Sequence, residues 1–177
     1  METAWKCSGV TPGATVSSRS VDDLARQEQH RRAGFPSKLQ KAADAYFVQR
    51  GAGKTLIAGY PWFGDWGRDT FIALRGLCLA TGRFEEARDI LVEWAGAVSE
   101  GMLPNRFPDH GETPEFNSVD ASLWYAIASH EFLQVASGTC TAEQISRIEA
   151  AIKSILDGYS NGTRFGIRLA ESGLLAC

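Results

Sequence analysis

Residues 60–69 (YPWFGDWGRD) bring aromatic rings, two carboxylates and a guanidinium together in one short loop. A sugar ring has flat C–H faces that can rest on aromatic rings, and its hydroxyl groups can donate to Asp and accept from Arg. The combination therefore suits a neutral, polyhydroxylated ligand. A helix beginning near Asp69 is expected to hold the loop in place. The structural alternative is a rigid turn in which Trp62 and Trp66 are simply buried in the core.

A second loop, over residues 101–117, repeats this chemistry, because 103–109 and 114–120 again mix amide, guanidinium, carboxylate and aromatic groups. Asn117, Ser118 and Asp120 lie where a further helix is expected to begin. Free backbone N–H groups and the helix dipole favour ionised carboxylates at that position. Plain capping remains the alternative for Ser118 and Asp120. Both loops precede helices, so they are expected on the same side of a helical body.

The spacing of apolar residues predicts about four helices, over 69–81, 84–98, 118–136 and from a Thr141–Gln144 capping box onwards. Short β-hairpins are expected before the first of these, at 46–58, and after the last, at 164–175. A short helix is expected from a Ser37 cap to Ala45. Alternating short and long connections indicate a mainly α protein, either a helical solenoid or an α/α toroid, with the long loops on its binding face.

Composition excludes several classes of function. The net charge of −3 and the pI near 5.6 argue against a nucleic-acid-binding surface, and no window is apolar enough for a membrane span. The first residues lack the pattern of a secretory signal, so a cytoplasmic protein is expected. The four cysteines are far apart, and Cys78, in an apolar stretch, is expected to be a small core residue.

Other motifs favour structural readings. Residues 51–55 (GAGKT) resemble the end of a phosphate-binding loop, but Val48 stands where that motif requires its first glycine, so a hairpin turn is preferred. Asp109, His110 and Glu112 have acceptable ligand types for a metal, but no second histidine lies nearby. They are interpreted as solvated loop residues. Neither a metal nor another cofactor is expected.

The chain resembles a known family over about residues 35–176. The segments that carry the resemblance are 57–63 (IAGYPWF), 66–74 (WGRDTFIAL), 80–84 (ATGRF), 103–108 (LPNRFP) and 117–124 (NSVDASLW). They are similar to the amylo-1,6-glucosidase domain of glycogen debranching enzymes. This resemblance implies an (α/α)6 toroid of the six-hairpin glycosidase type, without cofactors. It also implies hydrolysis, with inversion, of the α-1,6-linked glucose at a branch of glycogen or a related α-glucan.

The resemblance also implies roles for individual residues. Arg68 and Asp69 would bind glucose hydroxyls, and Asp120 would line the neighbouring wall. An inverting glycosidase needs a general acid and a general base roughly 6.5–9.5 Å apart, and the family's acid and base are expected downstream of this chain. Asp120 is kept as a secondary candidate for the acid. The substrate-binding candidates are Trp62, Asp65, Trp66, Arg68, Asp69, Asn105, Arg106 and Asn117.

We therefore expect residues 1–35 to be a poorly structured N-terminal segment, in which any helix would be solvated. Residues 36–177 are expected to be the N-terminal portion of an (α/α)6 catalytic domain, truncated before its acid and base. Two alternatives remain open. One is a non-catalytic α-glucan-binding helical module, and the other is a related toroid hydrolase acting on another glucoside such as trehalose. Self-association, covering exposed helix faces, is a further possibility.

Overall fold

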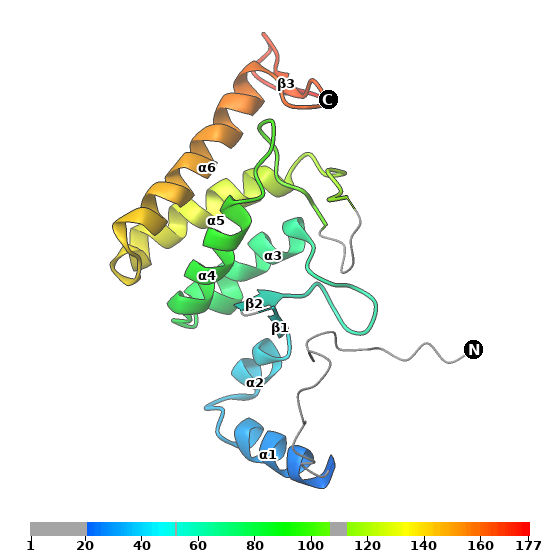
Figure 1. Ribbon diagram of the computed structural model, residues 1–177, viewed down its shortest axis with the longest axis vertical. Helices are drawn as coiled ribbons and strands as arrows, with labels where there is room; N and C mark the ends of the chain where they lie inside the picture. Colours follow the sequence, from blue (N-terminus) through cyan, green and yellow to red (C-terminus); the bar gives the residue numbers. More distant parts are fainter. Residues whose placement is uncertain (1–20, 52, 107–112) are drawn as a thin grey trace, which may run out of the picture. The chain divides into compact units, whose positions relative to one another are not determined.

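The computed structural model of the protein describes residues 21–51, 53–106 and 113–177 (Figure 1). The chain divides into two compact units, Met1–Ala42 and Ala43–Cys177. Helix α1 (Val21–Ala33) lies in the first unit, within the segment expected to have the least structure, and none of its residues is buried. Acidic residues in its first turn and basic residues in its last complement the helix dipole. It is the solvated helix that its polar composition predicts.

Helix α2 (Lys38–Asp44) follows, and the Ser37 hydroxyl accepts a hydrogen bond from the Gln40 amide at 3.1 Å, as predicted for its cap. The second unit begins within α2, at Ala43, and continues as an antiparallel hairpin of β1 (Phe47–Arg50) and β2 (Gly53–Leu56), in which Phe47 pairs with Leu56. Gly51 has a φ of 56°, which glycine adopts at little cost. The predicted hairpin is thus confirmed, and it leads directly into the aromatic loop.

The main helices are α3 (Gly67–Leu74), α4 (Phe84–Ala95), α5 (Ala121–Ala136) and α6 (Ala142–Asn161). The first begins earlier than predicted and continues as a π-helical turn, η1 (Arg75–Leu79), so the prediction of one helix over 69–81 is corrected. The prediction for 84–98 is also too long, because α4 ends at Ala95, before Gly96. A 3-10 turn, η2 (Ser137–Thr139), connects α5 to α6.

The start of α6 is as predicted. The Gln144 amide donates to the Thr141 hydroxyl at 3.2 Å, and the Thr141 amide donates to the Gln144 side chain at 2.9 Å. This reciprocal pair is a capping box, which satisfies two donors that the first turn of a helix leaves free. After α6, β3 (Arg168–Leu169) and β4 (Leu175–Ala176) form a short antiparallel hairpin, confirming a second hairpin in a shorter form.

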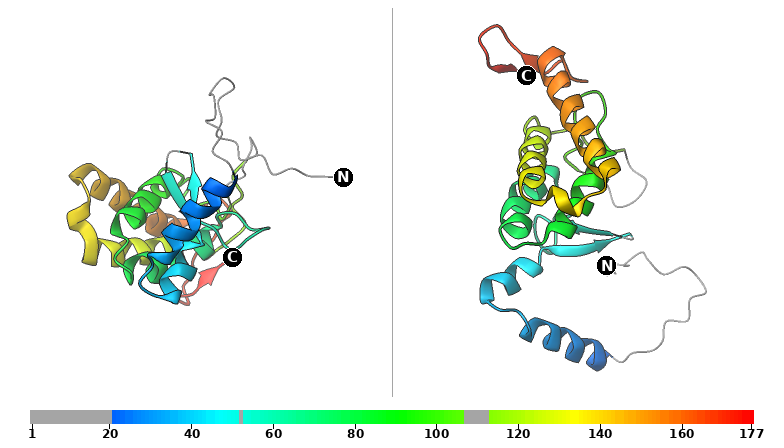
Figure 2. Two further views of the ribbon diagram at one scale, coloured as in Figure 1. Left: turned by 90° about the horizontal axis from the view of Figure 1, so that it is seen from below. Right: turned by 90° about the vertical axis from the view of Figure 1, so that its left-hand side faces the viewer.

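The four main helices of the second unit pack together. Helix α3 packs against α5, α4 packs against α6, and α5 also contacts both α4 and α6 (Figures 1 and 2). The unit is mainly helical, with two small antiparallel sheets. In the part of the chain that the structure describes, no helix combines the length and the apolar character needed to cross a membrane.

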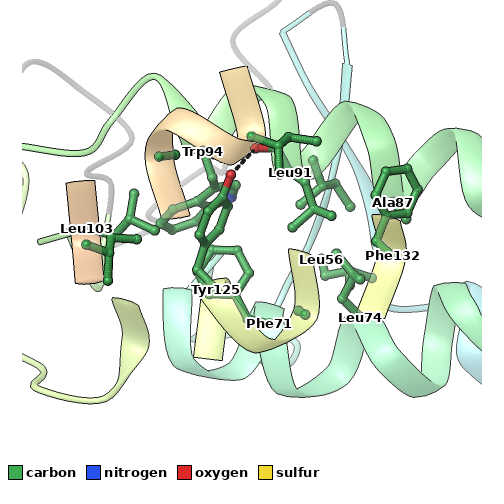
Figure 3. Close-up of a cluster of buried hydrophobic side chains, with 14 of the residues drawn as sticks. Leu56, Phe71, Leu74, Ala87, Leu91, Trp94, Leu103, Tyr125 and Phe132 are labelled. Atoms are coloured by element: carbon green, nitrogen blue, oxygen red, sulfur yellow. Dashed lines mark hydrogen bonds between the residues drawn. The ribbon is translucent and has the colours of Figure 1, made fainter. Parts of the chain in front are cut away.

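The core lies between these helices and is built around Phe71. Its ring meets the rings of Trp94 and Tyr125 edge-on, with centroid distances of 5.0 and 5.1 Å (Figure 3). The Tyr125 hydroxyl donates to the Leu91 carbonyl at 3.0 Å, which satisfies its polar group inside the core. Cys78 is fully buried in the same cluster, as predicted. This packing fixes α3, α4 and α5 relative to one another.

Candidate functional site

The N-termini of α3 and α5 meet at one end of the helical unit. Arg68, in the first turn of α3, donates from Nε to Asp120 Oδ1 at 2.8 Å, and Asp120 is the residue before α5. Further along, Arg75, which begins the π-helical turn η1 at the end of α3, donates two hydrogen bonds to Glu131 of α5, at 2.6 and 2.7 Å. The two helices therefore run in the same direction, and their first turns lie together.

Ser118 links the two charged groups. Its hydroxyl accepts from Arg68 Nη2 at 3.2 Å and donates to Asp120 Oδ1 at 2.7 Å. It also accepts from the Ala121 amide at 3.3 Å. Ser118 is nevertheless not the N-cap that was predicted, because α5 begins later, at Ala121, and its N-cap is Asp120, whose side chain forms no capping hydrogen bond. Because the side chains of Arg68 and Asp120 remain 49% and 43% exposed, a ligand can reach both.

The electrostatics of this pair favour an ionised carboxylate. Burial opposes ionisation of Asp120, but the hydrogen bonds from Arg68 and Ser118 outweigh it, so the pKa of Asp120 is lowered. A general acid requires a raised pKa, because it must carry a proton at working pH. The pairing with Arg68 therefore favours a binding role for Asp120 over the proton-donor role considered from the sequence.

Asn105 joins the second loop to the start of α3. Its backbone carbonyl accepts from the Gly67 amide at 2.7 Å, and its side-chain oxygen accepts from the Arg68 amide at 3.1 Å. These are first-turn amides that have no partner within the helix. Its side-chain nitrogen donates to Asn117 at 3.1 Å. A Cβ atom at Gly67 would lie 3.1 Å from the Pro104 carbonyl oxygen, so glycine permits this close approach.

Arg106, Glu115 and Asn117 form a neighbouring polar cluster. Arg106 Nη1 lies 2.6 Å from Glu115 Oε1, and Asn117 donates to Glu115 Oε2 at 3.1 Å. The Arg106 guanidinium also lies 5.9 Å from the centre of a Trp66 ring, and the backbones of these two residues form an antiparallel bridge. Glu115 holds both predicted site residues but was not itself singled out. The sequence feature that could have identified Glu115 is its position, as an acidic residue, in the same loop as Arg106.

Asp65 lies apart from this cluster in its contacts. It is only 4% exposed, forms an ion pair with Arg50 and accepts from the Thr55 hydroxyl at 3.2 Å. Burial raises the pKa of Asp65 and outweighs the opposing effect of Arg50. These contacts attach the aromatic loop to the β1–β2 hairpin. Arg50, placed in a hairpin from its sequence context, is the partner that sequence reasoning missed.

Residues 60–69, the aromatic loop, expose three of their aromatic rings to solvent. Tyr60, Trp62 and Phe63 are 70%, 80% and 55% exposed, which overturns the alternative in which Trp62 is buried in the core. The loop is closed by hydrogen bonds from Ala58 to Gly64, at 2.9 Å, and from Phe63 to Gly59, at 3.0 Å. Trp66 is half-buried at its base, and Asp69 is exposed in the first turn of α3.

The groups exposed at the site are hydrogen-bond donors and acceptors of the kind that hydroxyl groups can pair with. Donors and acceptors from Arg68, Asp69, Asn117 and Asp120 surround the meeting helix ends, and exposed rings precede α3. Among the described residues, no group of three or more histidine, cysteine or acidic side chains could hold a metal ion. The residues weighed as metal ligands, at 109, 110 and 112, lie outside the described residues.

Comparison with known proteins finds that the chain resembles a family and a relative from yeast. The model of a family described as amylo-alpha-1,6-glucosidase matches residues 41–177. Glycogen debranching enzyme of Saccharomyces cerevisiae is 36% identical over 86 residues, which cover 46% of this chain and 6% of the yeast protein. The match thus spans a small part of that relative. The family match includes every candidate site residue described above.

Proposed function

The chain belongs to the amylo-alpha-1,6-glucosidase family, and on this premise we propose that its second unit binds the branch glucose of a glycogen-type α-glucan for hydrolysis of the α-1,6 bond. The observation that carries the proposal is the Arg68–Ser118–Asp120 network at the meeting N-termini of α3 and α5. It places a bidentate donor beside an ionised acceptor, and both are open to a ligand. Such a pair can bind two neighbouring sugar hydroxyls.

The neighbouring residues divide into contacts and supports. In the proposal, Arg68, Asp69 and Asp120 contact glucose hydroxyls. The exposed Asn117 amide, which also bonds Asn105 and Glu115, adds its second N–H to these contacts. Trp62, which is exposed, offers a ring face to the sugar. The other candidates act mainly as supports in this proposal, because their functional groups are occupied by protein partners. These supports are Asp65, Trp66, Asn105 and Arg106.

We further propose that the second unit is part of an (α/α)6 toroid. The pairing of α3 with α5 and of α4 with α6 supports two concentric layers of helices. Ile127 and Val135 of α5 and Leu156 of α6 are 43%, 60% and 51% exposed, as expected for helices that have a further neighbour in a ring. Loops at one end of such a ring surround the substrate.

Hydrolysis requires proton transfer in addition to binding. Asp120 is held ionised by Arg68, so it suits hydrogen-bond acceptance from a sugar better than protonation of a leaving oxygen. We therefore assign the general acid and base to carboxyl groups of the family domain other than Asp69 and Asp120. If those carboxyl groups lie outside the 177 residues, the chain by itself binds glucan without releasing glucose. This is also the outcome expected for the alternative, a non-catalytic glucan-binding module.

The test is calorimetric titration of the 177-residue chain with glycogen limit dextrin, alongside an assay of glucose release. Arg68→Ala is expected to weaken binding by roughly tenfold or more, because hydrogen bonds to charged groups contribute about 1.5–3 kcal/mol. Lys153→Ala is the matched control, since Lys153 forms a surface pair with Asp157 on α6. Equal binding by Arg68→Ala and the unaltered chain would refute the proposed site.

Trehalose in the same titration separates the possible substrates. Tighter binding of limit dextrin supports the debranching assignment, whereas tighter binding of trehalose would indicate a related hydrolase that acts on this disaccharide. Glucose release that is lost in Asp120→Asn would overturn the assignment of the acid to another residue. Circular dichroism of each variant checks that loss of binding does not come from unfolding.

A further inference from the structure

A tight turn displays an aromatic ring just after α6. The Thr163 amide donates to the Ile167 carbonyl at 3.0 Å, and the Gly166 amide donates to the Thr163 carbonyl at 2.8 Å. Gly166 has a φ of 73°, a conformation in which glycine is strongly preferred. Thr163 and Ile167 are buried on either side of the turn. Its tip, Arg164 and Phe165, is therefore held by both flanks.

At this tip, Phe165 is 63% exposed and contributes nothing to the hydrophobic core. The Arg164 guanidinium lies 5.7 Å from the centre of the Phe165 ring and 3.9 Å from that of Phe116. Arg164 also pairs with Glu100, whose carboxylate lies 3.4 Å away and whose carbonyl accepts from the Arg164 amide at 3.1 Å. A guanidinium held in this way supports the exposed ring and leaves a polar rim around it.

The turn is attached to the loop that carries the glucose site. Phe116, which stacks with Arg164, directly precedes Asn117. The Tyr159 hydroxyl donates to the Val119 carbonyl, and Gly158 of α6 lies against Gly101. Figure 1 shows the end of α6 and β3 beside the loop that follows α4. The Phe165 ring is thus at the same end of the helical unit as Arg68 and Asp120.

We propose that Phe165, supported by Arg164 and Phe116, is a further glucosyl subsite, which binds a glucose unit of the same glucan chain beyond the branch glucose. The inference rests on the proposed function. The exposed ring offers a flat apolar surface for the C–H face of a sugar, and the guanidinium and carboxylate at its rim can bond hydroxyls. The resulting site binds longer glucans more tightly than short ones.

A protein interface is the competing use of this surface, because Leu169 and Leu174 on the same hairpin are 51% and 73% exposed. The polar rim favours the glucan. The Glu100 carboxylate lies 3.4 Å from Arg164, and glutamate is depleted at protein interfaces. The two uses differ in which residues matter, since an apolar interface would depend on Leu174 as much as on Phe165.

The experiment compares the affinities of the 177-residue chain for two branched saccharides, maltotriose and maltoheptaose that each carry one α-1,6-linked glucose. The unaltered chain is expected to bind maltoheptaose more tightly, and Phe165→Ala is expected to lose about tenfold in affinity for it, on the order of one aromatic contact. Affinity for maltotriose should remain unchanged. Phe165→Trp should restore the preference for the longer chain, and Leu174→Ala, on the same hairpin, should leave it intact.

The outcomes separate the two hypotheses. No binding of either saccharide by the unaltered chain overturns the proposed function and the subsite with it. Binding at the glucose site that is lost in Arg68→Ala but unaffected by Phe165→Ala overturns the subsite alone. A change of oligomeric state in Phe165→Ala and Leu174→Ala, measured by analytical ultracentrifugation without a change in glucan affinity, would identify the surface as a protein interface.

Discussion

Replacing Gly158 with alanine tests the contact that joins α6 to the loop of the candidate site. Alanine normally stabilises a helix interior by about 1 kcal/mol relative to glycine. Here an added Cβ atom would lie 2.5 Å from the Gly101 Cα atom and 3.1 Å from its carbonyl oxygen. Carbon atoms in favourable contact are about 3.5–4.0 Å apart. The neighbouring backbone must therefore move by about 1 Å.

The expected magnitude follows from these two opposing effects. Overpacking of this kind costs about 1–3 kcal/mol, which exceeds the gain in helix propensity at the upper end of that range. Gly101 cannot easily rotate away, because it has a φ of 76° and its own Cβ position is equally close to Gly158. We expect Gly158→Ala to lower the free energy of unfolding by up to about 2 kcal/mol. For a chain of this size, the upper figure corresponds to a fall of roughly 4–8 °C in Tm.

The assay is urea and thermal unfolding followed by the helical signal in circular dichroism. Gly76→Ala is the matched control, because a Cβ atom there has no neighbour within 4 Å and Gly76 has no positive φ. That variant is expected to gain about 0.4–1 kcal/mol. If Gly158→Ala were as stable as Gly76→Ala, the loop would yield freely at this contact. The Gly101–Gly158 approach would then not be what positions the loop.

Three further predictions concern ionisable groups. In Arg68→Ala the pKa of Asp120 should rise, as measured by NMR titration. In the unaltered chain, the Arg68–Asp120 pair adds to the free energy of unfolding above the unfolded pKa of Asp120, near 3.8. This stabilisation is lost only as the pH falls through the lower pKa of the folded state. An unchanged titration would refute the pairing in solution. The pKa of Asp65 is raised in the folded state, so the native state binds more protons than the unfolded state and the free energy of unfolding should fall as pH rises from 3.8 through the folded pKa. Urea titrations of Asp65→Asn should lack this dependence on pH. If the dependence persisted in that variant, the burial of Asp65 would be contradicted. Burial raises the pKa of Cys78 to about 12, so a thiol reagent at neutral pH should label exposed Cys177 but leave Cys78 unlabelled by mass spectrometry until urea unfolds the chain. Early labelling of Cys78 would refute its packing.

Features set by neighbouring residues were predictable. The Thr141–Gln144 capping box and the turn at Gly51 depend on contacts within a few positions of the chain, and both form as expected. The π-helical turn Arg75–Leu79 was not predicted, because its apolar spacing differs little from that of an α-helix. The end of α4 was missed for a related reason, since Ala97 and Val98 continue its apolar pattern beyond Gly96.

The candidate site was predictable in composition but only partly in geometry. The loops at 60–69 and 101–117 were recognised from their residue types, and their association follows from two helices that begin at the same end. The partners within them were not predictable. Asp65 pairs with Arg50, and Glu115 joins Arg106 to Asn117, because the backbone of each loop decides which side chains face one another.

The amino-acid sequence by itself determined the helices of this protein, the chemistry of its loops and its resemblance to a family that the family model confirms. Helix formation and capping are local, with contacts only three or four residues apart, so the periodicity of the chain suffices to specify them. Tertiary structure alone decided that Arg68 meets Asp120 across 52 positions and that Trp62 is displayed while Asp65 is buried. Such contacts depend on the packing of Phe71 between α4 and α5, because it holds helix ends that are distant in the sequence close enough for their polar groups to pair.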